Sequence, residues 1–161
     1  MASSDERPRD VLADLLPKFR FAMVTTTDDD GKLTARPLTV QEAEFDGDLW
    51  FIVGRDASVS QHIAARPAVG VALSTDDAWV SLAGRAEVVD DLERLRHYWS
   101  PAVDAWFPDG PEDPAVTLLR VDAISGEYWG SAGGRTSTLI SLITSKLTGK
   151  TAEPRNEKLD L

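Results

Sequence analysis

Turns built from Asp and Gly separate short runs of β-branched and apolar residues in the first third of this chain. The run Phe21–Thr27 is followed by Asp28-Asp29-Asp30-Gly31 and then by a second run, Leu33–Gln41. Gly31 can adopt the positive φ that tight hairpin turns require. The two runs are therefore predicted to pair as an antiparallel hairpin.

The same pattern continues through most of the chain. The further predicted strands are Leu49–Val53 after the turn Asp46-Gly47-Asp48, Ala68–Leu73, Trp79–Val89 with a bulge at Gly84, and Val116–Trp129, interrupted near Ser125-Gly126. Regular alternation of strand and helix is absent, which argues against a doubly wound sheet. We therefore predict a mainly β (α+β) fold of about six short strands that form a barrel with peripheral helices.

Helical patterns occur between and after these strands. The predicted helices are Asp10–Phe19, weakened by Pro17; Ser58–Ala65, capped by Ser58 and closed before Pro67; Asp90–Trp99; and an amphipathic helix with Leu139, Leu142, Ile143 and Leu147 on one face. Pro101–Pro114 is predicted to be a loop. The chain of 161 residues is predicted to form one domain, residues 1–161. Within it, residues 130–161 are a linker and a helix that packs on the barrel or on a second subunit.

Composition restricts the class of protein. The chain contains no Cys, so disulfides, thiolate metal sites and cysteine nucleophiles are excluded. No run reaches the roughly 18 apolar residues of a membrane helix, and Met1–Asp10 lacks the apolar core of a secretion signal, so a cytoplasmic location is the default expectation. The net charge of −10 makes nucleic acid an improbable partner. A phosphorylated ligand would need a local group of Arg side chains and backbone N–H groups.

Familiar catalytic and metal motifs are missing. His62 and His97 lie far apart in the sequence, and neither has a partner at ligand spacing, so no metal site is predicted. Nucleophile elbows, Walker A loops and dinucleotide-binding glycine motifs are absent as well. No catalytic residue is assigned.

What remains is a site made of arginine, backbone and aromatic groups. Arg36-Pro37-Leu38 lies within a strand, and Pro37 places that strand at an edge, a bulge or a barrel rim. Trp50-Phe51-Ile52-Val53 leads into Gly54-Arg55-Asp56-Ala57-Ser58, where a helix begins with a hydroxyl near an arginine. Such a helix start can bind an anion, and the two strands could hold a flat ring. The alternative is a pair of ordinary core strands followed by an ordinary capped helix.

Several of these segments resemble one known family. Arg36-Pro37-Leu38 with Gln41 is similar to the Arg-Pro-Met…Gln strand of the general-stress branch of pyridoxamine 5'-phosphate oxidase-like flavin-binding split barrels. The other matching segments are Asp46–Phe51, Arg66-Pro67-Ala68-Val69, Trp106–Pro114 followed by Glu127-Tyr128-Trp129, and in the tail Leu147–Lys150 with Asn156–Leu159. The resemblance covers nearly the whole chain, and the Trp-Phe-Pro loop with Tyr-Trp is its most specific part.

The resemblance implies a dimeric six-stranded split β-barrel with FMN at the subunit interface. FAD, a deazaflavin or no cofactor are the alternatives to FMN. The residues that it implies for the cofactor are Arg36, Pro37, Leu38 and Gln41 on one strand, the backbone of Ile52 and Val53, Arg55 and Ser58 near the phosphate, and Trp129 from a second subunit. Relatives usually carry Lys where this chain has Val59, so one phosphate cation is lost, and Val59→Lys is expected to tighten FMN binding.

Two functions follow from the resemblance. The first is an FMN-dependent oxidoreductase that acts on an unidentified small substrate. The second is a stress-related protein that binds flavin without turnover, or that has lost its cofactor. Pyridoxamine phosphate oxidation itself is disfavoured because the C-terminal Arg and Pro pattern of those oxidases is not evident. A haem-handling barrel is disfavoured because neither His is suitably placed. A homodimer is expected because five Trp and an amphipathic helix provide more apolar surface than one small barrel covers.

Overall fold

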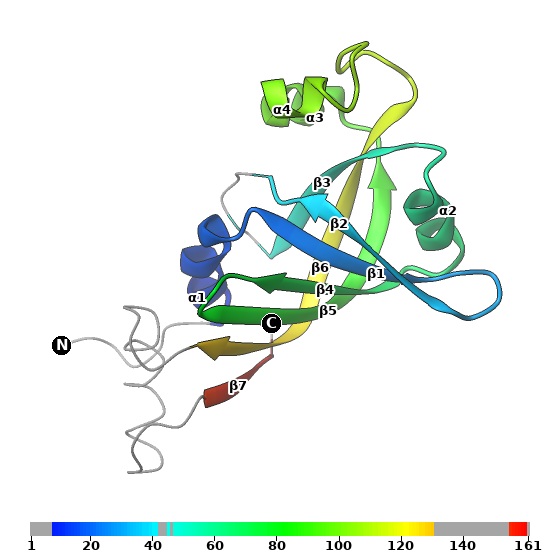
Figure 1. The fold of residues 1–161 in the computed structure, drawn as a ribbon. Helices are drawn as coiled ribbons and strands as arrows, with labels where there is room; N and C mark the ends of the chain where they lie inside the picture. Colours follow the sequence, from blue (N-terminus) through cyan, green and yellow to red (C-terminus); the bar gives the residue numbers. More distant parts are fainter. Residues whose placement is uncertain (1–7, 42–44, 46, 131–154, 161) are drawn as a thin grey trace.

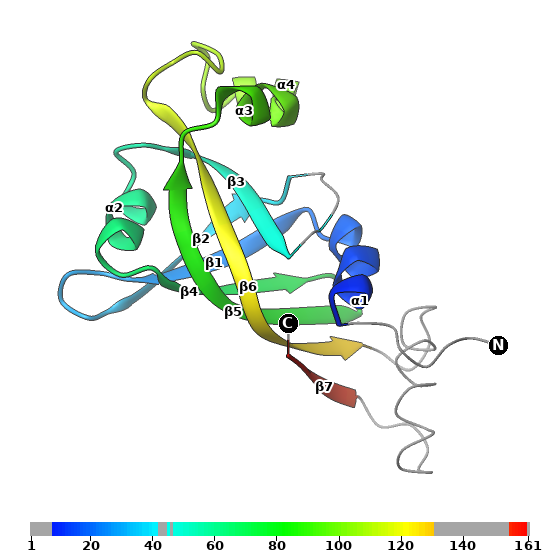
Figure 2. The ribbon, with the colours of Figure 1, turned by 180° about the vertical axis from the view of Figure 1, so that it is seen from behind.

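One antiparallel sheet organises this protein, whose computed structural model describes residues 8–41, 45, 47–130 and 155–160. The hydrogen-bonded order of the strands is β2-β1-β4-β5-β6-β3, and β7 also pairs with β6. The strands are β1 (Phe21–Thr27), β2 (Leu33–Thr39), β3 (Asp48–Gly54), β4 (Ala68–Ser74), β5 (Ala78–Val89), β6 (Val116–Gly130) and β7 (Arg155–Asp160). The sheet is strongly curled, as Figures 1 and 2 show. This confirms the predicted mainly β barrel, open between its two outer strands, β2 and β3.

The β1–β2 hairpin forms as predicted. Its turn is stabilised by Asp28, whose Oδ1 accepts hydrogen bonds from the backbone N–H groups of Asp30 and Lys32, both at 2.9 Å. Gly31 has the expected positive φ of 80°. The strand ends at Thr39 and not at Gln41, so Gln41 lies just beyond it.

Alternation along β3 divides the apolar side chains between two clusters. Leu49, Phe51 and Val53 point into the main core of the barrel, together with apolar side chains of β1, β4, β5 and β6. Trp50 and Ile52 point to the other face, where they pack with Leu95, Tyr98 and neighbouring apolar residues. Both faces of β3 are covered, and its sequence is therefore a continuous apolar run without polar alternation.

Short helices lie at the ends and sides of the curled sheet (Figure 1). They are α1 (Pro8–Leu15), the 3₁₀ turn η1 (Leu16–Lys18), α2 (Ser58–Ala65), α3 (Leu92–Tyr98) and α4 (Pro101–Asp104). The first helix ends earlier than predicted because Pro17, which has no N–H to donate, lies in the 3₁₀ turn. The one-turn helix α4 lies in the segment predicted to be a loop.

The predicted cap at Ser58 is wrong. Ala57 is the N-cap of α2 and has no side-chain acceptor, while Ser58 is the first helical residue and its side chain is exposed. In α3, by contrast, Asp91 is a regular N-cap whose carboxylate accepts from the Arg94 N–H at 3.0 Å.

The predicted bulge at Gly84 is present. The register of β5 against β6 shifts between Ala83 and Gly84, which leaves Ile124 of β6 as the extra residue. β6 nevertheless continues as one strand through Ser125-Gly126. A Cβ atom at Gly84 would collide with the backbone carbonyl of Asp122. The position therefore requires glycine because of a close backbone approach.

Gly84→Ala is expected to lower the free energy of unfolding by about 1–3 kcal/mol, because the facing backbone must move. Gly70→Ala on the neighbouring strand β4 is the matched control. There the nearest atom to an added Cβ, the Cβ of Thr25, is 3.9 Å away, so we expect anything from no change to a gain of about 1 kcal/mol. Urea unfolding of both variants measures the difference. Equal stabilities would contradict the close approach at Gly84.

The C-terminal part departs from the expectation. Residues 155–160 form β7, which pairs with the second half of β6 from Ser125 to Gly130. No strand was predicted there. The predicted amphipathic helix with Leu139 and Leu147 lies outside the described residues. Among the described residues, no helix is long and apolar enough to cross a membrane.

Candidate functional site

The two outer strands, β2 and β3, border the place where the barrel does not close, which we call the split. Among the described strands, β2 pairs only with β1, and β3 pairs only with β6. Each therefore has one edge with backbone N–H and C=O groups that no strand uses. Pro37 lies on β2, which confirms the prediction of an edge strand. A flat ligand with polar edges can bind between such strands without competing with the sheet.

Arg36 lies on β2, on the same face as Thr34 and Leu38. Its Nη1 donates to the Val24 carbonyl at 3.2 Å and to Thr26 Oγ1 at 2.7 Å, and its Nη2 donates to Thr34 Oγ1 at 3.1 Å. All three acceptors are neutral. Among the residues that the structure describes, Arg36 makes no ion pair.

Burial lowers the pKa of the Arg36 guanidinium from its ordinary value. The group still remains charged, because arginine is not deprotonated in proteins. A partly buried cation without a carboxylate is unusual in a chain of net charge −10. This is the local positive potential that a phosphorylated ligand requires.

His62 of α2 joins this group. Its Nδ1 lies 2.9 Å from Thr26 Oγ1 and 3.4 Å from Thr34 Oγ1. Thr26 is a buried polar residue with 1% exposure, and it faces Thr34 directly in the hairpin. We name Arg36, Thr26, Thr34 and His62 the arginine–histidine cluster. Sequence reasoning missed the two threonines, although period-2 alternation already puts Thr34 on the same face as Arg36.

Arg55 is in a different situation from Arg36. Its Nη2 is 2.6 Å from Asp90 Oδ1, and its Nε donates to the Pro114 carbonyl at 2.9 Å. The hydrogen bond from Arg55 lowers the pKa of Asp90. Arg55 is therefore already neutralised and contacts the loop that follows α4. No contact joins it to Arg36 among the described residues.

The predicted residues at the start of α2 differ in exposure. The side chain of Ser58 is exposed, whereas Val59 is 4% exposed and belongs to the main core. Val59, the position where the resemblance implied a lost cation, therefore has a side chain that points into the barrel. Of the residues predicted to bind the phosphate, Arg36 and Ser58 remain available for a ligand, whereas Arg55 is paired with Asp90.

The residues predicted to lie along the ring fall on both strands. Leu38 is half-buried and packs against the main core on the same face of β2 as Arg36. The side chains of Ile52 and Val53 point to opposite faces of β3, so β3 can offer both to one ligand only through its backbone. Trp129 lies on β6 and pairs with Trp79 of β5, in the half of β6 beyond Asp122, the last residue of β6 that pairs with β3. Trp129 is not brought to the split within one chain.

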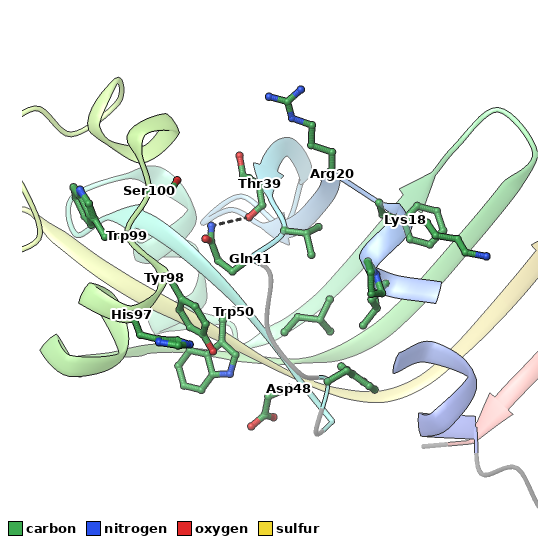
Figure 3. A pocket seen from close by; sticks show the side chains of 16 residues that line it. Lys18, Arg20, Thr39, Gln41, Asp48, Trp50, His97, Tyr98, Trp99 and Ser100 are labelled. Carbon is green, nitrogen blue, oxygen red and sulfur yellow. Dashed lines mark hydrogen bonds between the residues drawn. The ribbon is translucent and has the colours of Figure 1, made fainter. Parts of the chain in front are cut away.

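A cavity of about 790 Å³ lies next to the split. Gln41 lines it from the end of β2, and its amide donates to the Thr39 carbonyl at 3.2 Å (Figure 3). Trp50 and Tyr98 form an aromatic wall with ring centroids 6.4 Å apart. Sequence reasoning had assigned these aromatics to a strand and a helix, and only their packing reveals the cavity. Its volume suits a small organic molecule.

Known proteins resemble this chain in sequence and in structure. The family model described as pyridoxamine 5'-phosphate oxidase like matches residues 7–153. Protein bli-3 of Neurospora crassa is 28% identical over 153 residues, which are 88% of this chain and 73% of that protein. A crystal structure from Jannaschia sp. CCS1, described as a general stress protein 26, superimposes with a TM-score of 0.71 at 28% identity and full coverage of both chains.

A second solved structure carries a description of its ligand. It is the general stress FMN/FAD-binding protein of Xanthomonas citri, with a TM-score of 0.63, 28% identity, and coverage of 77% of this chain and 86% of that chain. These matches agree with the split barrel that the strand order shows, and they confirm the family resemblance found in the sequence. The chain belongs to the pyridoxamine 5'-phosphate oxidase-like family, in the general stress protein 26 group of split β-barrels.

Proposed function

We propose that this protein binds FMN in the split between β2 and β3, as a homodimer, and uses it in redox chemistry on a small substrate. The observation that supports this most directly is Arg36, a partly buried cation on an edge strand with no carboxylate partner among the described residues. It lies two residues from Leu38 on the same face, so an anion and the ring attached to it can follow one strand. The edge of β3 offers backbone groups on the other side of the split.

The residues present fit a flavin phosphate and ring. Arg36 uses three of its five N–H donors for Val24, Thr26 and Thr34, so two remain for a phosphate. FMN, when bound, supplies the electron transfer, while the protein binds the cofactor, orients it and excludes water. The cavity beside Gln41 offers a place for a substrate of small size.

An exposed apolar face supports the dimer. Phe21 and Met23 of β1 and Trp79 of β5 are large apolar side chains with 52%, 43% and 47% exposure. Met23 pairs in register with Pro37 and with Ala72, both uncharged, and the guanidinium of Arg20 lies over the Phe21 ring at 5.2 Å at the border of this face. Trp129 faces Trp79 across the β5–β6 ladder and lies on the same face. Pairing of two subunits through this face would cover it and bring Trp129 toward the second subunit.

Met23→Glu is expected to shift the protein from dimer to monomer, because it places a charge in the apolar face. Leu92→Glu is the matched control, since Leu92 is 42% exposed but lies on α3. Light scattering at micromolar concentration measures the mass against the 17.6 kDa of one chain. A wild-type protein of 17.6 kDa would exclude the dimer.

The flavin proposal is tested on the wild-type protein by its absorbance spectrum and by titration with FMN, followed through quenching of flavin fluorescence. We expect saturable binding. No saturation at high micromolar FMN would contradict the proposal. The second candidate, a split barrel without turnover or without cofactor, is favoured by Val59, which leaves one fewer cation near the phosphate. Saturable binding without reduction of the flavin by any tested donor would favour that candidate.

A further inference from the structure

The ring of His62 contacts two threonine hydroxyls through its Nδ1 atom. Thr26 Oγ1 and Thr34 Oγ1 both accept hydrogen bonds from Arg36, at 2.7 and 3.1 Å. Each hydroxyl therefore keeps its own proton to donate, and His62 Nδ1 lies 2.9 and 3.4 Å away. A hydroxyl has a second lone pair and can also accept from an Nδ1–H group, so these contacts agree with either tautomer. When Thr26 donates to Nδ1, and likewise when the ring is protonated, Nε2 carries a proton.

Nε2 is the free end of this arrangement. Among the residues that the structure describes, no hydrogen-bond partner lies at His62 Nε2. The contact between Nδ1 and Thr26 orients the ring, and Nε2 lies on the side of the ring away from the Thr26 hydroxyl. A histidine that only stabilised the hairpin would need Nδ1 alone.

The position of His62 on α2 places this donor near the anion side of the split. His62 follows Ser58 by four residues, so the two side chains lie on one face of the helix. Val59 points into the core and leaves this face to Ser58 and His62. Arg36 contacts the same two hydroxyls as His62, and two of its N–H donors are unused.

The geometry points to His62 as a second phosphate-binding residue, whose Nε2–H donates to the phosphate monoester that Arg36 neutralises. This inference rests on the proposed flavin function. It assigns to the arginine–histidine cluster a preference for phosphorylated over unphosphorylated flavin. FMN and riboflavin share the same ring, and only FMN carries the phosphate. The cluster should therefore affect the affinity for FMN and not the affinity for riboflavin.

Two substitutions of His62 separate its two nitrogens. His62→Asn keeps an acceptor near the position of Nδ1 for the threonines but has no group at the position of Nε2. His62→Gln extends an amide to the position of Nε2. His97→Asn on α3 is the control for a histidine outside the cluster. FMN and riboflavin are titrated into each full-length protein by fluorescence quenching, and melting temperatures are recorded without ligand.

We expect His62→Asn to weaken FMN by about tenfold and to leave riboflavin unchanged. His62→Gln should retain most of the FMN affinity, and His97→Asn should match the wild type. Equal FMN affinity of His62→Asn and the wild type would overturn the inference while leaving the flavin proposal intact. Equal losses for FMN and riboflavin would also overturn it, because they would show a structural role. A wild type that binds neither ligand would overturn the flavin proposal and this inference together.

Discussion

Arg36→Ala should weaken FMN binding by about ten- to a hundredfold, which is about 1.5–3 kcal/mol. Charge-assisted hydrogen bonds are roughly twice as strong as neutral ones. Among the described residues, no carboxylate competes with the phosphate for the guanidinium of Arg36. Riboflavin, which lacks the phosphate, should bind the variant and the wild type about equally. Fluorescence quenching titrations with both ligands measure the effect.

Arg55→Ala is the matched control for this experiment. Arg55 carries the same charge and was also predicted to lie near the phosphate, but it is paired with Asp90 at 2.6 Å. We expect Arg55→Ala to change FMN affinity by less than about threefold, because exposed ion pairs contribute little. If Arg55→Ala lost as much affinity as Arg36→Ala, Arg55 would have to leave Asp90 when FMN binds. If Arg36→Ala weakened riboflavin as strongly as FMN, the role of Arg36 would be structural.

Val59→Lys is expected to reduce the free energy of unfolding of the ligand-free protein by about 2–4 kcal/mol. The change removes a core side chain that is 4% exposed, worth about 1.5–3 kcal/mol, and adds a cation in the first turn of a helix, which is unfavourable by about 0.3–1 kcal/mol. For a chain of this size the melting temperature should fall by roughly 4–16 °C. Differential scanning calorimetry without ligand gives this value.

Addition of FMN tests the second half of the expectation. If the new ammonium reaches the phosphate, FMN binds more tightly and raises the melting temperature of Val59→Lys more than that of the wild type. Ser58→Lys is the control, because it adds the same charge at the neighbouring exposed position and should alter stability by at most about 0.5 kcal/mol. An unchanged melting temperature of ligand-free Val59→Lys would show that Val59 is not packed in the core.

Much of the local structure could be predicted from single segments. The β1–β2 hairpin follows from Asp28-Asp29-Asp30-Gly31, and the bulge follows from Gly84 within an apolar strand. Pro37 correctly placed its strand at an edge, because a residue without an N–H cannot serve a central strand. The bounds of α2 were also predicted correctly, although its cap was not. These features depend on turn chemistry and alternation, which operate over a few residues.

The candidate site needed more than local signals. The sequence singled out Arg36, but it did not show that Arg36 would have no acidic partner while Arg55 is bound by Asp90, 35 residues away. His62 and Thr26 are separated by 36 residues, and only the packing of α2 against the hairpin brings them together. β7 was missed because a short charged segment becomes a strand only when a neighbouring edge, here the second half of β6, is free to pair with it.

The sequence by itself therefore determined where β1 to β6 lie, which of their faces are apolar, and which strand carries an arginine at an edge. The tertiary structure decided the order β2-β1-β4-β5-β6-β3, the open side of the barrel, and which polar groups meet there. The physical reason is the range of the interactions. Alternation and turn geometry act between neighbours in the chain, whereas sheet closure and the pairing of charges depend on contacts between segments whose proximity is set only when the whole sheet curls.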